Sequence, residues 1–219
     1  MTKLDKPGFI TVDGADGSGK STVVNHIVKR LEEAGISNLF TPVLQGGPAG
    51  REVYKRMLGK KEHKEEDLSF ILGMATCIQE TYEDRVLPAL EEGFVFICDR
   101  YLPSYYSYQA AASGSMLAKQ IHQVLYRTMT RRPDLYLFLD VDTDISIQRL
   151  SHRKNQSDIL DQKARTFKEA VILGYRADFI EHDSGWRVRI NANQSTEDVL
   201  RDVDVQIDKF IELRNRYDK

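Results

Sequence analysis

The chain has 219 residues, and 41% of them are hydrophobic, which is enough apolar material for one sizeable core. Its formal net charge of −2 gives no general electrostatic attraction to nucleic acid or to an anionic membrane. The two cysteines, Cys77 and Cys98, lie in apolar surroundings without metal-ligand spacing, which favours buried free thiols over a disulfide. With no signal peptide or membrane-length apolar run in the sequence, we expect a cytoplasmic protein.

The first predicted strand, residues 9–12, leads into a phosphate-binding sequence. Residues 14–22 read GADGSGKST, which fits the pattern G-x-x-x-x-G-K-[ST], and a helix-like stretch follows from 23 to 31. Such a loop brings backbone N–H groups to phosphate oxygens at the positive end of a helix dipole. We expect Lys20 to reach the β- and γ-phosphates of ATP and the Ser21 hydroxyl to ligate Mg²⁺. The predicted ATP-binding residues are Gly14, Asp16, Gly17, Ser18, Gly19, Lys20, Ser21 and Thr22.

Further strands are predicted at 38–43, 94–98, 135–141 and 188–190, with helical periodicity between them. Three apolar stripes are expected to face the core: Leu68, Ile71, Leu72 and Ala75; Met116, Ala118, Ile121, Val124 and Leu125; and Val199, Val203, Ile207, Phe210 and Leu213. Strands that alternate with helices predict an α/β fold of three layers, a parallel sheet with helices on both faces, in one domain over 1–219. The turn-rich loop 45–50 after the second strand is either a substrate contact or a plain connector.

The strand 94–98 is followed by an acid, a base and a cluster of tyrosines. Asp99 and Arg100 come directly after this buried strand, where parallel sheets place their ligands. Asp99 is expected to hold Mg²⁺ or its water shell, and the planar guanidinium of Arg100 to clamp a phosphate.

Together these blocks resemble the thymidylate kinase family. The resemblance rests on FITVDGADGSGKST (9–22), DRYLPSYYSYQ (99–109) and PDLYLFLDV (133–141), in the family's order and over nearly the whole chain. It also covers a lid-like stretch at about 150–161, the residues Phe167 and Tyr175 on the following helix, and residues 189–192, which resemble the family's last strand and adenine loop. The lid-like stretch and its approach carry Arg149, Arg153, Asp158 and Asp161.

The resemblance implies a homodimeric P-loop kinase that transfers the γ-phosphoryl group of ATP to a nucleoside 5′-monophosphate, with Mg²⁺ as cofactor. Gly17 stands where one type of family member carries an arginine, so the transition-state cation is assigned to the lid residues Arg153 or Arg149, the latter also an ATP contact. The alternative for this basic run is a solvated helix end. Asp16 is implied to contact the 3′-hydroxyl or phosphate of the acceptor. Tyr108 is implied to fill the space of a ribose 2′-hydroxyl, or else it is a packed tyrosine.

The departures from the family pattern all fall on the acceptor side. The family's TREPGGT block is replaced by PVLQGGP (42–48), without its arginine and glutamate. The positions that read the base and stack on it align with Thr76 and Leu72, and Tyr105 replaces a small polar residue. Either another side chain has taken over the base contact, with Gln79, Gln109 and Arg51 as candidates, or the accepted base differs, as in a modified pyrimidine deoxynucleotide.

Two other functions remain open from the sequence. A deoxynucleoside kinase needs a general base beside the sugar hydroxyl, but the position after the second strand holds 43–45, Val-Leu-Gln, and no carboxylate. A catalytically weak, nucleotide-binding regulatory homologue would tolerate the altered acceptor motifs, but it needs fewer of the residues Lys20, Ser21, Asp99 and Arg100.

Overall fold

The computed structural model describes residues 7–42, 47–48, 50–52, 55, 67–152, 164–181 and 186–215. Within these residues five parallel strands form one sheet in the order β2-β3-β1-β4-β5. The strands are β1 (Gly8–Gly14), β2 (Asn38–Pro42), β3 (Val95–Asp99), β4 (Leu135–Asp140) and β5 (Trp186–Asn191). Every strand predicted from an apolar run is present, with ends that differ by at most two residues.

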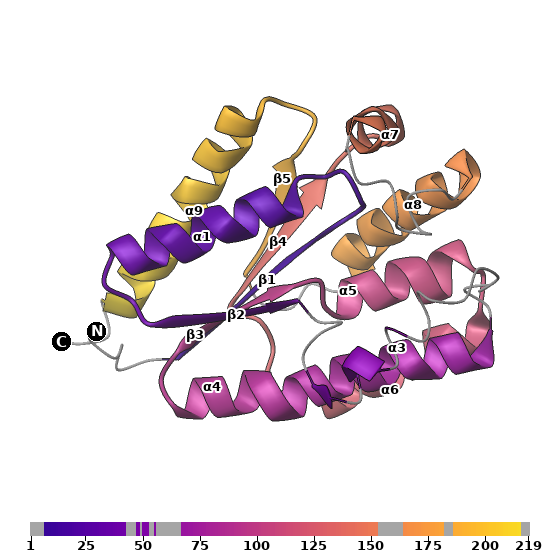
Figure 1. The fold of residues 1–219 in the computed structure, drawn as a ribbon, viewed down its shortest axis with the longest axis horizontal. Coiled ribbons are helices and arrows are strands. Elements are labelled where there is room, and N and C mark those ends of the chain that lie inside the picture. The colour runs from indigo at the N-terminus through magenta and orange to yellow at the C-terminus, as the bar shows by residue number, and fades with distance from the viewer. Residues whose placement is uncertain are drawn as a thin grey trace.

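Helices cover both faces of this sheet (Figure 1). The first face carries α1 (Lys20–Glu33) and α9 (Thr196–Asn215), which contact each other. The second face carries α3 (Leu68–Thr81), α4 (Leu87–Glu91), α5 (Leu102–Tyr105), α6 (Met116–Thr128) and α8 (Arg165–Glu181), whereas α7 (Thr143–Ser151) follows β4. Two π-helical stretches, η2 (Tyr82–Val86) and η3 (Tyr106–Ala112), continue α3 and α5. This arrangement confirms the predicted three-layer α/β fold.

The buried apolar residues form two clusters. Ile10 and Val12 of β1 belong to the cluster that also contains residues of α1, α9 and α8, and Phe9 belongs to the cluster that contains residues of α3 to α6. Because neighbouring side chains of a strand alternate between faces, a strand buried on both sides reads as a continuous apolar run. This is the reason the central strands β1, β3 and β4 could be found in the sequence, whereas the edge strands β2 and β5 are partly exposed.

Some stripe residues predicted to be buried are exposed. Leu68 and Leu72 of α3 are 55% and 48% exposed, although Ile71 and Ala75 on the same helix are buried. Met116 and Val124 of α6 are 69% and 59% exposed, and Leu213 of α9 is also exposed. The apolar stripes on these helices are wider than the contact with the sheet, so their edges remain at the surface.

The strand register places the predicted functional residues at one edge of the sheet. Val12 of β1 pairs with Asp99 at the end of β3, so the loop after β1 and the residues after β3 emerge side by side. The loop position Gln45, the lid position Arg153 and the lid residues 153–161 lie outside the described residues.

Candidate active site

The N-terminus of α1 has the features of an anion-binding site. Its N-cap residue is Gly19, which has φ 94° and no side chain that could accept a hydrogen bond from the first turn. The first turn also contains no acidic residue. The amide groups of this turn and the positive end of the helix dipole are therefore left to a ligand, as a phosphate-binding loop requires.

Lys20 and Arg100 meet at the same backbone oxygen. The Lys20 ammonium donates to the carbonyl oxygens of Gly14 and Ala15, both at 2.9 Å. The Arg100 guanidinium donates to the Gly14 oxygen through Nη1 at 3.2 Å. Burial, with the nearby charge of Arg100, lowers the pKa of Lys20 to about 8. Two cations so close together favour a multiply charged anion between them.

The backbone holds Arg100 in an unusual conformation. Among the described residues, Arg100 alone combines a side chain with a positive φ, 69°. This conformation costs of order 1–3 kcal/mol and persists where the surroundings fix it. The Arg100 N–H donates to the Val12 oxygen at 3.0 Å, and the following N–H, of Tyr101, donates to Asp13 Oδ1 at 3.1 Å. The turn after β3 is therefore fixed by β1.

Asp13 starts a chain of side-chain hydrogen bonds that ends at Arg100. The buried Asp13 Oδ1 accepts from the Ser104 hydroxyl at 2.5 Å, and the Ser104 oxygen lies 2.6 Å from the Tyr175 hydroxyl. Arg100 Nη1 donates to the Tyr175 hydroxyl at 3.1 Å. Burial raises the pKa of Asp13 to about 6, against the lowering effect of its hydrogen bonds. This series of hydrogen bonds orients the Arg100 guanidinium.

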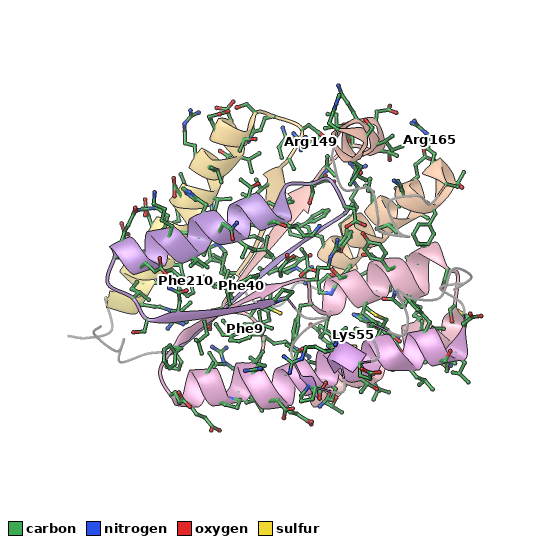
Figure 2. The ribbon with its side chains drawn as sticks, viewed as in Figure 1. Phe9, Phe40, Lys55, Arg149, Arg165 and Phe210 are labelled. Carbon is green, nitrogen blue, oxygen red and sulfur yellow. The ribbon has the colours of Figure 1, made fainter. Side chains whose placement is uncertain are left out.

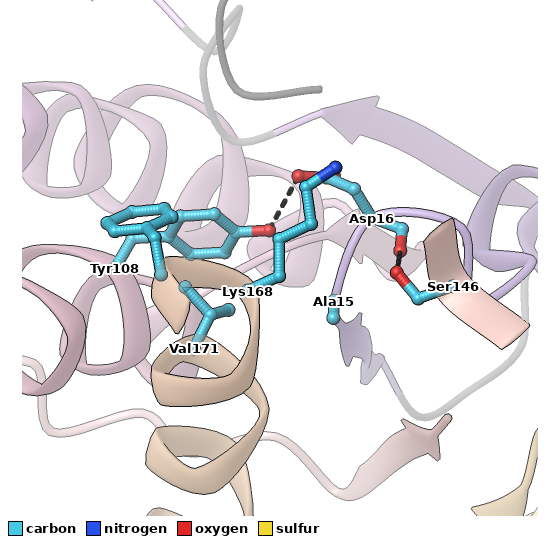
Figure 3. A pocket seen from close by; sticks show the side chains of 7 residues that line it. Ala15, Asp16, Tyr108, Ser146, Lys168 and Val171 are labelled. Atoms are coloured by element: carbon cyan, nitrogen blue, oxygen red, sulfur yellow. Dashed lines mark hydrogen bonds between the residues drawn. The ribbon is translucent and has the colours of Figure 1, made fainter. Parts of the chain in front are cut away.

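Asp16 gathers contacts from three other elements. Arg100 Nη2 pairs with its Oδ1, and the Tyr108 hydroxyl of η3 donates to its Oδ2 at 2.7 Å. Burial keeps the pKa of Tyr108 well above its usual value, so the hydroxyl stays protonated. Figure 3 shows this contact together with the Ser146 hydroxyl of α7, which donates to the Asp16 backbone oxygen at 2.7 Å. Asp16, Tyr108 and Ser146 line a small cavity of about 10 Å³ beside the phosphate loop, along which the Lys168 side chain extends from α8.

Asp99 and Ser21 fit the needs of a magnesium ion. Asp99 Oδ1 is buried and has no hydrogen-bond partner among the described residues, and Ser21 is exposed in the first turn of α1. Within the part of the chain that the structure describes, no group of three His, Cys, Asp or Glu side chains could form a metal cage. Mg²⁺ beside a nucleotide needs no such cage, because waters and phosphate oxygens complete its octahedron.

Arg149 joins the phosphate loop to the turn after β5. Its Nη1 donates to the Ala192 oxygen at 2.8 Å and to the Gly17 oxygen at 3.4 Å, and its Nη2 donates to the Gln194 oxygen at 3.1 Å. In Figure 2 Arg149 lies at the same end of the molecule as Arg165 of α8. With its donors engaged by three carbonyls, Arg149 is suited to hold the wall of a nucleotide site rather than to move onto a reacting phosphate.

Comparison with known proteins agrees with this geometry. The family model described as thymidylate kinase matches residues 12–203. This chain belongs to the thymidylate kinase family. The thymidylate kinase of Ligilactobacillus salivarius is 32% identical over 197 residues, which cover 89% of this chain and 94% of the relative. The thymidylate kinase of Halalkalibacterium halodurans is 32% identical over 201 residues, which cover 91% of this chain and 95% of the relative.

Within this family fold, the residues predicted to contact the acceptor base have different surroundings. Tyr105 is 1% exposed, and its hydroxyl donates to the Ile71 oxygen at 3.3 Å, so we expect it to pack the core rather than to touch a base. Thr76 is exposed on α3, and its hydroxyl donates to the Leu72 oxygen at 3.0 Å. Arg51 is exposed, and Gln109 is 3% exposed within η3.

Four residues of the candidate site were not predicted from the sequence. Asp13, Ser104, Ser146 and Lys168 all lie beside the predicted residues. Asp13 could have been found, because a carboxylate that ends an apolar strand needs partners or a raised pKa. Ser146 and Lys168 gave no signal, since each reaches the site from a helix whose position depends on the tertiary fold.

Proposed function

We propose that this chain transfers the γ-phosphoryl group of ATP to dTMP or to a closely related pyrimidine deoxynucleotide. The convergence of Lys20 and Arg100 on the Gly14 carbonyl carries the proposal, because it sets two cations where two phosphorylated molecules would meet. Family membership supports it over the two alternatives, a deoxynucleoside kinase and a regulatory homologue.

The phosphate loop and Lys20 form the ATP side of the mechanism. When a nucleotide binds, the amide N–H groups of the first turn of α1 donate to its phosphate oxygens, and the Lys20 ammonium exchanges the Gly14 and Ala15 carbonyls for these oxygens. Ser21 and Asp99 would hold a magnesium ion, which would neutralise phosphate charge. Arg149 holds the turn 192–194 against Gly17, where the adenine of ATP would lie.

Arg100 forms the acceptor side. Its guanidinium is held by Tyr175 and Asp16, and its Nη1 donates to the Gly14 oxygen of the loop. The remaining N–H groups of the guanidinium bind the acceptor phosphate. A monophosphate is already an oxyanion, so transfer needs positioning and charge stabilisation and no general base. Of the two lid arginines, we assign the transition-state role to Arg153, because the donors of Arg149 are occupied.

Asp16 and Tyr108 determine the choice of sugar in this proposal. The Tyr108 ring is 6% exposed and its hydroxyl is tied to Asp16, so the ring cannot easily move aside for a 2′-hydroxyl. Asp16 then accepts from the 3′-hydroxyl of a deoxyribose. Base recognition falls to residues of α3 and the loop before it: Arg51, Leu72 and Thr76, with Gln109 behind them.

The proposed assembly is a homodimer of one-domain chains, each with its lid at 150–161. Its support is the exposed apolar edge of α3 and α6, with Leu68, Leu117 and Val124. Among the described helices, none has the length and apolar composition to cross a membrane. We propose that the protein works in the cytoplasm.

The test is an ADP-release assay with ATP and Mg²⁺ against dTMP, UMP, modified pyrimidine deoxynucleotides and thymidine. We expect turnover on dTMP or a modified pyrimidine deoxynucleotide and none on thymidine. Turnover on thymidine alone would contradict the proposal in favour of a nucleoside kinase. ATP binding without ADP release on any acceptor would support the regulatory alternative.

A further inference from the structure

Lys168 of α8 is a cation of the candidate site without an assigned role. Its side chain is half-buried and lines, together with Asp16 and Tyr108, the small cavity beside the phosphate loop. In Figure 3 this side chain extends from α8 toward Asp16. The cavity, of about 10 Å³, has room for no more than a water molecule. Lys168 therefore faces the phosphate loop itself and not a ligand held inside this cavity.

The helix α8 gives no reason for a cation at this position. The residues three and four positions before and after Lys168 are Ala164, Arg165, Val171 and Ile172, so none of the positions that pair along a helix is acidic. Lys168 also lies near the N-terminal end of α8, where the positive end of the helix dipole disfavours a cation. Its counter-charge is therefore expected outside α8, and Asp16 is the carboxylate that lines the same cavity.

Packing between α8 and η3 fixes the place of Lys168. The neighbouring Phe167 ring lies against the Tyr108 ring, with 6.3 Å between the centroids. Further along α8, a Cβ at Gly174 would lie 2.9 Å from Ser107 Cα, so the backbone of α8 rests directly on η3. Because Tyr108 also donates to Asp16, the same packing sets the distance from α8 to the phosphate loop.

A second cation near Asp16 changes what Arg100 can do. Asp16 pairs with Arg100 through Oδ1 and accepts from Tyr108 through Oδ2. A carboxylate has about four acceptor sites, so a further donor can be accommodated. In the proposed transfer Arg100 must bind the acceptor phosphate while Asp16 remains beside it. A carboxylate without a second cation would retain the guanidinium and repel the phosphate.

We propose that Lys168 is a positioning residue for the acceptor, a role that rests on the proposed function. Its ammonium balances the charge of Asp16, and this lets the Arg100 guanidinium bind the acceptor phosphate. Because Lys168 acts through Asp16, its loss should weaken the binding of the monophosphate more than that of ATP. The same loss should have little effect once Asp16 carries no charge.

Steady-state kinetics with ATP and Mg²⁺ test this role. Lys168→Met should raise the KM for dTMP, or for the modified deoxynucleotide that turns over, by about fivefold. Both kcat and the KM for ATP should change by less than about twofold. Lys168→Arg keeps the charge and should restore the KM for the acceptor. Lys209→Met makes the same chemical change on the exposed side of α9 and should have no effect.

A double-mutant cycle shows whether Lys168 works through Asp16. Asp16→Asn removes the charge, while its amide oxygen can still accept a hydrogen bond. In this background Lys168→Met should change the KM for the acceptor by less than about twofold. In thermal unfolding of the ligand-free protein, Lys168→Met should lower the melting temperature by about 2 °C more in the wild type than in the Asp16→Asn variant.

The outcomes separate this role from the proposed function. Absence of turnover by the wild type on every acceptor would refute the function, and the role of Lys168 with it. With an active wild type, an unchanged KM for the acceptor in Lys168→Met would overturn the role of Lys168 alone. The role would also be overturned by an equal rise in the KM for ATP, or by equal effects of Lys168→Met in the two Asp16 backgrounds.

Discussion

Replacing Asp13 by asparagine should stabilise the protein more at alkaline pH than at acid pH. The folded-state pKa of Asp13 is about 6, raised by burial from 3.8. A carboxyl with a raised pKa contributes stability that is complete below its unfolded pKa and lost as the pH rises through its folded pKa. The shift of about two units corresponds to roughly 3 kcal/mol of lost stability at pH 8, and about 1.4 kcal/mol of that loss occurs between pH 5 and pH 8.

Asparagine keeps the geometry and removes the charge. Its Oδ1 still accepts from the Tyr101 N–H and the Ser104 hydroxyl, whereas its amide group takes the place of Oδ2, which has no hydrogen-bond partner among the described residues. The unpaired amide lowers the stability of the variant by ~1–3 kcal/mol at every pH. The prediction therefore concerns how the effect of the substitution on stability differs between the two pH values.

Thermal unfolding at pH 5 and pH 8 measures this difference. Relative to the wild type, the melting temperature of Asp13→Asn should rise by about 3–6 °C more at pH 8 than at pH 5. The exposed Asp84 of η2 offers a matched control, since Asp84→Asn makes the same chemical change at the surface and should give no such difference. An advantage of Asp13→Asn that is equal at both pH values, or larger at pH 5, would refute the reasoning.

Four further outcomes are expected. Lys20→Ala and Arg100→Ala should each lower turnover by about 100- to 1,000-fold with the fold intact by circular dichroism, and unchanged turnover removes that residue from the mechanism. Tyr108→Ala should reduce the dTMP/UMP ratio of kcat/KM, whereas Tyr108→Phe, which keeps the ring, should preserve it; an unchanged ratio in the alanine variant contradicts the steric role. Arg149→Ala should raise the KM for ATP by about tenfold and leave the KM for the acceptor nearly unchanged. An equal rise of both KM values would contradict a role of Arg149 in shaping the adenine site. Gly174→Ala should lower thermal stability by ~1–3 kcal/mol, because a Cβ there lies 2.8 Å from Ala111 Cβ and 2.9 Å from Ser107 Cα; a stable variant would show that α8 can shift.

The sequence predicts the fold well, and it predicts that Arg100 lies beside the phosphate loop, for simple reasons. Strands buried on two faces give unbroken apolar runs, and parallel order brings their carboxyl ends to one edge. Asp99 and Arg100 could therefore be placed beside the loop at 14–22 without coordinates, and the structure confirms that Arg100 and Lys20 share a contact.

Other features depend on packing that no local pattern records. Leu72 has the same helical spacing as Ile71 and Ala75, but only the tertiary fold decides which edge of α3 meets the core. The contacts of Arg149 require the turn after β5 to approach Gly17, two segments that are far apart in the sequence. The raised pKa of Asp13 likewise arises from the complete burial that several elements create together.

The close approach of Gly17 to α7 limits how this enzyme can evolve. Gly17 has φ 78°, and a Cβ there would lie 2.7 Å from the Ser146 oxygen. Any side chain at this position would push against the backbone of α7. The loop is also attached to α7 by a hydrogen bond, because the Ser146 hydroxyl donates to the Asp16 backbone oxygen. An arginine at Gly17 would therefore require α7 to shift, so in the proposed mechanism one substitution in the loop could not take over the role assigned to the lid.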